Sequence, residues 1–146
     1  MNKRWREYFQ RITEEVSRQS TCLRRSVGAV LVKDKRVIAT GYNGNPSGME
    51  HCSRCVRDES GSRLDICTGV HAEVNALYQC AKYYGQADGT VMFCTTFPCN
   101  DCLKGLIQCG VKRIYYRDYY QLDHEAEQTR ILLLEGSGLE VFTWDG

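Results

Sequence analysis

Short runs rich in β-branched residues alternate with amphipathic stretches along this chain of 146 residues, and this alternation constrains the fold more than any other feature. Strand-like runs occupy residues 27–33, 36–42, 90–96, 111–116 and 140–144, and helical stretches occupy residues 3–19, 71–84, 98–110 and 123–135. The order α-β-β-α-β-α-β-α-β favours a five-stranded mixed sheet covered by helices, with a hairpin at one end and parallel strands at the other. We therefore predict an α/β fold with three layers, α-β-α, in a single domain over residues 1–146.

The first helix and the first hairpin carry the clearest periodicity. Four apolar residues follow one another at spacings of 4, 3 and 4, which places them on one stripe of a helix: Trp5, Phe9, Ile12 and Val16. The runs VGAVLVK and RVIATGY flank a polar turn at Asp34 and Lys35, as expected for paired strands. Residues 43–69 show no period, and a loop of this length in a compact domain needs an anchor other than a hydrophobic face.

Nine cysteines stand against three histidines, which indicates either disulfides or thiolates held for metal or catalysis. Nine is odd, so complete pairing within the chain is impossible. The N-terminal MNKRWREYFQ has no apolar signal-peptide core, and no window reaches the roughly 18 apolar residues of a membrane helix. We therefore expect a cytoplasmic protein in a reducing compartment, where metal binding explains the cysteines better than disulfides do.

Two short segments carry the candidate chemistry. VHAEVNA contains His71 and Glu73, TTFPCNDC contains Cys99 and Cys102, and each segment falls at the first turn of a predicted helix. One imidazole and two thiolates make three ligands for Zn²⁺, and three protein ligands with an open fourth position are typical of a catalytic zinc. Helix N-termini favour thiolate over thiol, which suits both cysteines. Glu73 is then free for proton transfer.

The arrangement HAE…PCxxC is the signature of zinc-dependent nucleobase deaminases, and the chain resembles the cytidine and deoxycytidylate deaminase superfamily. The likeness is closest to deoxycytidylate (dCMP) deaminases, through SVGAVLV, TGYNGNPSG, HAEVNA and TTFPCNDCLKGLIQCGVKRIYY, and it spans about residues 20–144. The resemblance implies a cytidine-deaminase-like fold and hydrolysis of dCMP to dUMP and ammonia, in pyrimidine metabolism and the supply of a dTTP precursor.

These residues suggest a mechanism. Zinc held by His71, Cys99 and Cys102 would lower the pKa of a water molecule from about 15.7 toward about 7 to 9. Glu73 would take the proton, protonate N3 of the pyrimidine as oxygen attacks C4, and carry a proton to the departing amine. One carboxyl group thus acts first as a base and then as an acid.

Four further residues are candidate substrate contacts, implied by the resemblance. They are Asn43 of the GYNG motif near the sugar, Ala72 through its backbone, Asn75 of the HAExNA pattern, and Tyr120 as an aromatic wall for the base. A simple Asn-Gly turn is the alternative for Asn43, and a core or surface position is the alternative for Tyr120. Phosphate recognition has five candidates that the sequence does not distinguish: Arg24, Arg25, Arg54, Arg57 and Lys104.

Four other cysteines suggest a second metal. Deaminases that this chain resembles hold a structural zinc with ligands at the positions of Cys22 and Cys52. We predict a tetrahedral structural zinc held by Cys22, Cys52, Cys55 and Cys67, of which the last two are inferred from chemistry. His51 is an alternative ligand, and four buried free thiols are the alternative to the site. Packing alone accounts for the three remaining cysteines, Cys80, Cys94 and Cys109.

Two alternatives to dCMP deamination stay open. One is a deaminase acting on another cytosine nucleoside, nucleotide or nucleobase, and the other is a non-enzymatic zinc-binding module, which leaves His71 and Glu73 unexplained. The net charge, 19 − 18 = +1, disfavours a polynucleotide or a membrane as partner. The resemblance also implies a homo-oligomer, often a hexamer, and control by dTTP and by dCTP with Mg²⁺.

Overall fold

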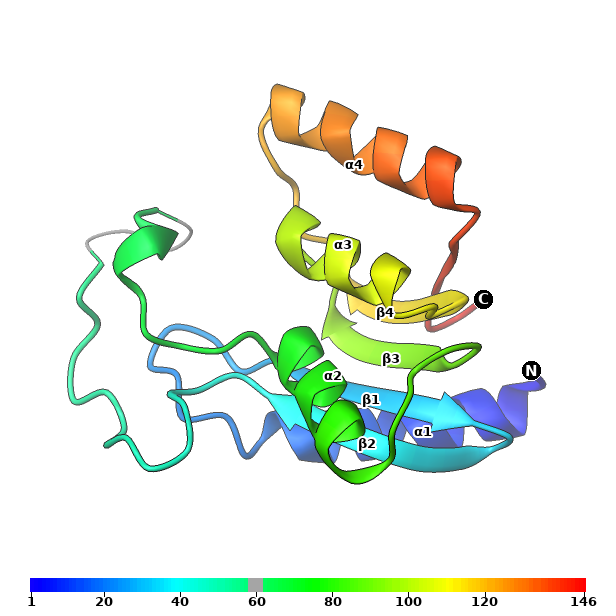
Figure 1. Ribbon diagram of the computed structural model, residues 1–146, viewed down its shortest axis with the longest axis horizontal. Coiled ribbons are helices and arrows are strands. Elements are labelled where there is room, and N and C mark those ends of the chain that lie inside the picture. The colour runs from blue at the N-terminus through cyan, green and yellow to red at the C-terminus, as the bar shows by residue number, and fades with distance from the viewer. Residues whose placement is uncertain (58–61) are drawn as a thin grey trace.

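The computed structural model describes residues 1–57 and 62–146, and its strands form one mixed sheet (Figure 1). The strands are β1 (Gly28–Lys33), β2 (Arg36–Tyr42), β3 (Val91–Thr96), β4 (Arg113–Asp118) and β5 (Glu140–Thr143). They lie in the order β2-β1-β3-β4-β5, with β1 antiparallel to both neighbours and β3, β4 and β5 parallel. The hairpin thus lies at one end of the sheet and the parallel strands at the other, as predicted.

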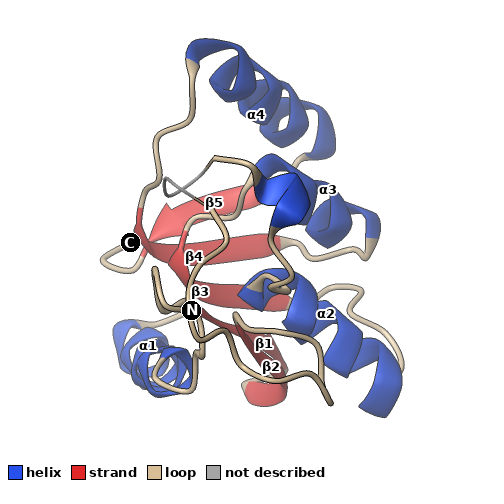
Figure 2. Ribbon diagram, turned by 90° about the vertical axis from the view of Figure 1, so that its left-hand side faces the viewer, coloured by secondary structure: helices blue, strands red, loops and turns tan. Residues whose placement is uncertain are grey.

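Helices cover both faces of this sheet (Figure 2). One face carries α1 (Lys3–Ser17), and the other carries α2 (Ala72–Tyr83) and α3 (Asn100–Gln108), with α4 (His124–Ser137) beside α3. A short 3-10 helix (Leu64–Ile66) lies between β2 and α2. The predicted three-layer arrangement around a five-stranded mixed sheet is confirmed. None of the helices in the described chain is long and apolar enough to span a bilayer.

Alternate residues of the strands fill two separate cores. Under α1, Phe9 starts a row of aromatic rings that continues through Phe93, Tyr115 and Phe142, with successive centroids 5.5, 4.9 and 5.4 Å apart. The predicted apolar stripe of α1 faces this row, so that prediction is confirmed. Under α2 and α3 the core is mainly aliphatic and includes Leu31, Ala76, Met92, Leu103, Leu106 and Ile114.

The ends of the elements differ from the predictions by a few residues, for local reasons. His71 and Cys99 are the N-caps of α2 and α3, so α2 begins one residue later and α3 two residues later than predicted. The strand predicted from residue 111 begins at Arg113 because Gly110 ends α3 with a φ of 83° in a Schellman motif. The Val111 N–H donates to the Leu106 carbonyl at 3.0 Å and is therefore still part of the helix end.

The described parts of the long connection between β2 and α2 project from one end of the sheet (Figure 1). A bridge between Gly44 and Val70 closes its base. Arg24 anchors the described part from the segment before β1, because its Nε donates to the Cys55 Sγ at 3.0 Å and its Nη2 donates to the Arg57 carbonyl. This polar contact supplies the non-hydrophobic anchor that the sequence leads us to expect.

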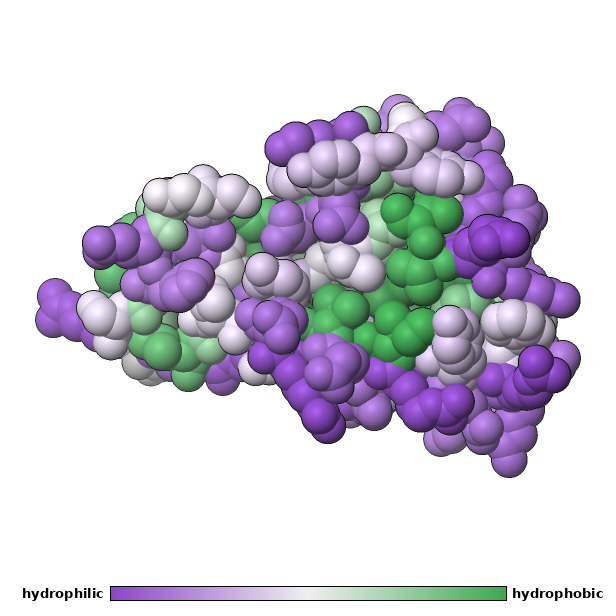
Figure 3. Space-filling model, turned by 90° about the horizontal axis from the view of Figure 1, so that it is seen from below, coloured by the Kyte–Doolittle hydropathy of each residue, from purple (hydrophilic) through white to green (hydrophobic). Residues whose placement is uncertain are grey.

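The strand β2 forms an edge of the sheet. Seen from below, apolar side chains gather on the face that β2, α1 and α2 present, inside a hydrophilic rim (Figure 3). Two amides of α2 cover outward-facing backbone groups of this edge: Gln79 Oε1 accepts from the Thr40 N–H at 2.6 Å, and Asn75 Nδ2 donates to the Tyr42 carbonyl at 2.9 Å. These contacts satisfy groups that an open edge would leave unpaired.

Gly41 lets α2 lie directly against β2. A Cβ at this position would lie 2.2 Å from the Ala72 carbonyl oxygen and 2.4 Å from the Ala76 nitrogen, and both atoms belong to the backbone of α2. We predict that Gly41→Ala displaces the first turn of α2 and lowers the free energy of unfolding by about 1–3 kcal/mol, measured by chemical denaturation. Gly136→Ala is the control, because a Cβ there meets no atom within 4 Å, and it should be neutral or stabilising. Equal stabilities of the two variants would contradict this account.

Candidate active site

The first turns of α2 and α3 bring three candidate ligands together. His71 caps α2, Cys99 caps α3, and Cys102 lies in the first turn of α3. The His71 Nδ1 lies 3.5 Å from the Cys99 Sγ and 3.3 Å from the Cys102 Sγ, and the three ligand atoms lie within 4.8 Å of one another. In residues 1–57 and 62–146, no other group of three or more His, Cys, Asp or Glu side chains comes together in this way.

The spacing of these atoms suits a tetrahedral zinc ion. Zn–S bonds of about 2.3 Å and Zn–N bonds of about 2.0–2.1 Å put neighbouring sulfur and nitrogen ligands about 3.5 Å apart at a tetrahedral angle. The two sulfur-to-nitrogen distances of 3.5 and 3.3 Å agree with this value. The donor set therefore fits zinc, and three protein ligands leave a fourth coordination position open.

The pKa values of the three candidate ligand side chains shift in different directions. The pKa of Cys99 falls to about 4, because the Cys102 thiol donates to its sulfur and the His71 ring lies alongside. The Cys99 sulfur and burial raise the pKa of Cys102, and the contact with Cys99 raises the pKa of His71. One thiolate is therefore present at neutral pH, and a metal ion must displace the proton of Cys102 when it binds.

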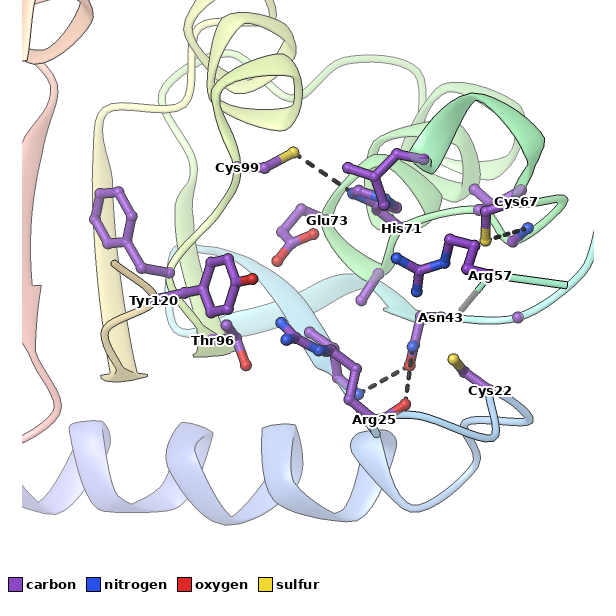
Figure 4. A pocket seen from close by; sticks show the side chains of 17 residues that line it. Cys22, Arg25, Asn43, Arg57, Cys67, His71, Glu73, Thr96, Cys99 and Tyr120 are labelled. Atoms are coloured by element: carbon purple, nitrogen blue, oxygen red, sulfur yellow. Dashed lines mark hydrogen bonds between the residues drawn. The ribbon is translucent and has the colours of Figure 1, made fainter. Parts of the chain in front are cut away.

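Glu73 is a buried carboxyl group in the first turn of α2, beside these ligands. It is 4% exposed, and its side chain points into the pocket near Cys99 and Tyr120 (Figure 4). Burial raises its pKa to about 7, and the charge on Cys99 adds to the increase. The group can take up and release a proton near neutral pH, as an acid–base catalyst must.

A pocket opens beside Glu73, and segments far apart in the sequence line it (Figure 4). They are the segment before β1, the end of β2, the long loop, the first turn of α2, and the residues that follow β3 and β4. The lining consists of Cys22, Arg25, Val27, Asn43, Gly44, Arg57, Leu64, Cys67, Gly69, Val70, His71, Ala72, Glu73, Thr96, Phe97, Cys99 and Tyr120. The sequence patterns do not single out Thr96 and Phe97 as pocket residues, although both lie directly before the Pro98 that precedes the ligand Cys99.

The structure places three of the four predicted substrate contacts in the pocket lining. Asn43, Ala72 and Tyr120 line the pocket, but Asn75 does not. The Asn75 amide instead donates to the Tyr42 carbonyl at the edge of β2. Its position accounts for a structural role, and the HAExNA pattern alone could not reveal which way this side chain points.

Asn43 clamps the segment that precedes β1. Its Oδ1 accepts from the Val27 N–H at 2.9 Å and from the Ser20 hydroxyl at 2.5 Å, and its Nδ2 donates to the Arg25 carbonyl at 3.0 Å. These bonds hold the backbone of Arg25 while its guanidinium lies 4.6 Å from the centroid of the Tyr120 ring. Asn43 therefore does more than form a turn, because it also positions a cation in the pocket.

Two of the five candidate cations for phosphate line the pocket. They are Arg25 and Arg57. Arg57 is 9% exposed, and its Nε has no hydrogen-bond partner among the described residues. Arg24 anchors the long loop instead, and Lys104 pairs with Asp101 on α3 at 3.1 Å. The pocket geometry thus separates arginines that the sequence could not distinguish.

The four cysteines of the predicted second site do not form a ligand cluster in the described chain. Cys22 and Cys67 line the side of the pocket away from Tyr120 (Figure 4). The Arg24 hydrogen bond lowers the pKa of Cys55, while Cys52 lies against the Asn45 amide with 3.6 Å between Sγ and Nδ2. None of the nine cysteines is paired in a disulfide, and the alternative ligand His51 is exposed. The second zinc stays a prediction.

Comparisons with known proteins match most of the chain. A family model described as the cytidine and deoxycytidylate deaminase zinc-binding region matches residues 3–118. The ComE operon protein 2 of Bacillus subtilis is 39% identical over 139 residues, which cover 94% of this chain and 69% of that protein. The deoxycytidylate deaminase of Schizosaccharomyces pombe is 35% identical over 143 residues, which cover 94% of this chain but 43% of that protein. The chain thus spans less than half the length of the second relative.

A solved structure matches in both fold and length. The crystal structure of dCMP deaminase from the cyanophage S-TIM5 in complex with dCMP and dUMP has a TM-score of 0.82 and 35% sequence identity, over 98% of each chain. The α-β-α fold, with a His/Cys/Cys group and a glutamate at two helix N-termini, defines the class of zinc-dependent nucleobase deaminases. Within this class, the chain belongs to the cytidine and deoxycytidylate deaminase family.

Proposed function

We propose that this chain hydrolyses dCMP to dUMP and ammonia, as one deaminase domain over residues 1–146. The observation that carries the proposal is a buried carboxyl group, Glu73, with a pKa raised to about 7, beside three side chains that could hold a metal ion. The family of the chain supports the reaction type. The S-TIM5 enzyme, which matches over 98% of both chains, supports dCMP as the substrate.

His71, Cys99 and Cys102 would hold Zn²⁺, which when bound supplies a Lewis acid that makes water nucleophilic near neutral pH. Glu73 takes one proton from the attacking water and gives it to N3 of the cytosine ring. It then takes the second proton of the same water oxygen and gives it to the amino group on C4. The C4–N bond breaks, ammonia leaves, the water oxygen remains on C4, and Glu73 returns to its starting state.

The pocket offers groups for each part of the nucleotide. The backbone of Ala72 lies between His71 and Glu73 and suits the edge of the base, while Tyr120 suits one of its walls. Asn43 suits the sugar, because it lines the same cavity where β2 ends (Figure 4).

Arg25 and Arg57 suit the 5′-phosphate. Both line the pocket, and none of the ion pairs among residues 1–57 and 62–146 involves Arg57. Among the described residues, the Arg57 Nη1 donates to the Ser62 carbonyl at 3.2 Å and no carboxylate pairs with the guanidinium. The fork of N–H donors on this side chain matches phosphate oxygens. A nucleotide offers a phosphate to Arg25 and Arg57 whereas a free nucleoside does not, so these residues favour dCMP over deoxycytidine.

A second, structural zinc at Cys22, Cys52, Cys55 and Cys67 is part of the proposal. Arg24, two residues after Cys22, contacts the Cys55 sulfur. Asn45 contacts the Cys52 sulfur and also accepts from the Thr68 hydroxyl at 2.6 Å, next to Cys67. Two polar side chains therefore link segments that carry all four thiols, and four thiolates are a usual ligand set for structural zinc.

The wider setting of the enzyme follows from the resemblance and the cysteines. Nine cysteines without a disulfide suit the reducing cytoplasm. Assembly as a homo-oligomer, as a hexamer in related enzymes, and control by dTTP or by dCTP with Mg²⁺ are parts of the proposal that the resemblance alone supports.

Replacing Glu73 with Gln removes the proton carrier and keeps the shape of the side chain. We expect Glu73→Gln to fold, to retain its metal and to lose dCMP turnover by at least about 100-fold, because it can neither accept nor return the two protons. Ammonia release by wild type and variant, compared at equal zinc content, measures the effect. Near wild-type turnover would remove Glu73 from the mechanism.

Replacing Arg57 with Met tests phosphate recognition. We expect KM for dCMP to rise about 10-fold or more while deoxycytidine turnover is unchanged, because only the nucleotide loses a charged hydrogen bond. Arg54→Met, on an exposed residue of the same loop, is the control. Ammonia release is measured from dCMP, CMP, deoxycytidine and cytidine, with and without dCTP plus Mg²⁺. Failure of the wild type to deaminate dCMP under either condition would overturn the substrate assignment.

The zinc content of the wild type and of two cysteine variants tests the catalytic and the structural zinc site independently. We expect two zinc ions per chain in the wild type and one each in Cys99→Ser and Cys52→Ser, with Cys99→Ser folded but inactive. One zinc ion per wild-type chain would refute the structural site. Unfolding of Cys99→Ser would instead support a structural zinc module, since loss of a structural zinc site removes folding energy.

A further inference from the structure

The helix α4 buries a charged residue where an apolar one would be expected. Within α4, all of which the structure describes, Arg130 is the only buried residue, and its side chain is 1% exposed. Its guanidinium lies against Phe97 and Tyr119, 4.7 and 5.0 Å from the ring centroids, and its Nε has no hydrogen-bond partner in the part of the chain that the structure describes. Burial of a charge carries a large desolvation penalty that an apolar side chain avoids. The partners of Arg130 should therefore explain its presence.

Two hydrogen bonds of Arg130 end on backbone carbonyls of the active-site loops. The Nη2 donates to the Pro98 carbonyl at 3.0 Å, and the Nη1 donates to the Tyr120 carbonyl at 2.9 Å. Pro98 directly precedes the candidate ligand Cys99, and Tyr120 lines the pocket. The two loops follow β3 and β4, which are neighbouring parallel strands. One guanidinium thus spans the gap between the ligand loop and the pocket wall.

Glu127, one turn earlier in α4, holds this guanidinium in place. Its Oε1 lies 3.2 Å from the Arg130 Nη1. The same carboxylate accepts from the Leu122 N–H at 2.8 Å and from the Tyr119 hydroxyl at 2.7 Å. These contacts fasten the loop that carries Tyr120 to α4 on both sides of that residue.

We propose that Arg130 is a positioning residue that sets the distance between the Tyr120 wall and the Cys99 ligand through its two carbonyl contacts. The role for substrate binding rests on the proposed function, whereas the contacts to Pro98 and Tyr120 do not. Two-point attachment of this kind matters because a displacement of about 1 Å in an active site can cost about 100-fold in rate.

A purely structural role for Arg130 makes a different prediction. Its loss would then destabilise α4 but leave folded molecules with normal zinc binding and kinetics. Arg113 is the matched control, because it bonds the Glu140 carboxylate at 2.8 and 3.2 Å and stacks 5.4 Å from the Phe142 centroid. These partners lie on β5, away from the pocket lining.

The test compares zinc-loaded Arg130→Met, Arg130→Lys and Arg113→Met, each held below its own unfolding temperature. Zinc release to a chromogenic chelator reports on the Cys99 loop without turnover, and KM for dCMP reports on the Tyr120 wall. We expect Arg130→Met to release zinc about 10-fold faster and to raise KM by about 10-fold or more. Arg130→Lys retains the charge and can reach one carbonyl, so we expect intermediate values. Arg113→Met should match the wild type in both measurements.

A double-mutant comparison with Tyr120→Ala completes the test. If Arg130 acts through Tyr120, Arg130→Lys adds no further increase in KM once Tyr120 is alanine. Wild-type zinc release and KM in the Arg130 variants, or additive effects on KM, would overturn the proposal. If Arg130→Met does not fold, Arg130→Lys serves for every comparison. Faster zinc release in a chain whose wild type does not deaminate dCMP would support the positioning role and refute the proposed function.

Discussion

The whole site depends on two helix N-termini being held side by side at one end of the sheet. The first turn of α2 carries His71 and Glu73, and the first turn of α3 carries both cysteine ligands. Gly41 allows α2 to approach β2 closely enough for this arrangement, and α3 begins a few residues after β3 ends. Helix N-termini also direct unpaired N–H groups toward the ligands, which favours the thiolate form. The two helix N-termini thus determine both where the ligands lie and which of their protonation states is favoured.

The position of Glu73 in the buried first turn of α2 also carries a free-energy penalty for ionising its carboxyl group. An increase of its pKa from 4.5 to about 7 corresponds to roughly 3 kcal/mol. The folded state binds this proton more tightly than the unfolded state, so the penalty is absent below pH 4.5 and is fully present above about pH 7. Glu73 by itself therefore lowers the stability of the metal-free fold as pH rises through this window, whereas Cys99, whose pKa falls from 9.0 to about 4, contributes in the opposite direction. A cation held by His71, Cys99 and Cys102 would oppose the penalty, so metal binding and the ionised carboxylate support each other.

The fold and the ligand group could be predicted from sequence for a physical reason. The stripe from Trp5 to Val16 and the alternating strands are periodic, and periodicity directly reports which side chains are buried. The three ligands and Glu73 lie in two short segments. Their residue types, one histidine, two cysteines and a glutamate, directly indicate metal binding and proton transfer. Arg57 and Arg130 carry no such pattern, because their environments come from residues distant in the sequence. The HAExNA pattern predicts a substrate contact at Asn75, but it carries no information on the neighbouring edge of β2, which the Asn75 amide contacts.

Polar side chains hold the loops that form the pocket, in addition to apolar contacts such as Phe97 against Tyr116. Asn43 donates to the Arg25 carbonyl, Arg24 to the Arg57 carbonyl, and Arg130 to the Tyr120 carbonyl. These loops must leave a cavity open, so an apolar core cannot close over them completely. A hydrogen bond to a carbonyl fixes the backbone of a loop residue and leaves its side chain available to the pocket. The side chains that we assign to substrate binding therefore belong to residues whose own backbone carbonyls accept a hydrogen bond. Every residue type has a backbone carbonyl, so the sequence does not indicate which carbonyls are used in this way.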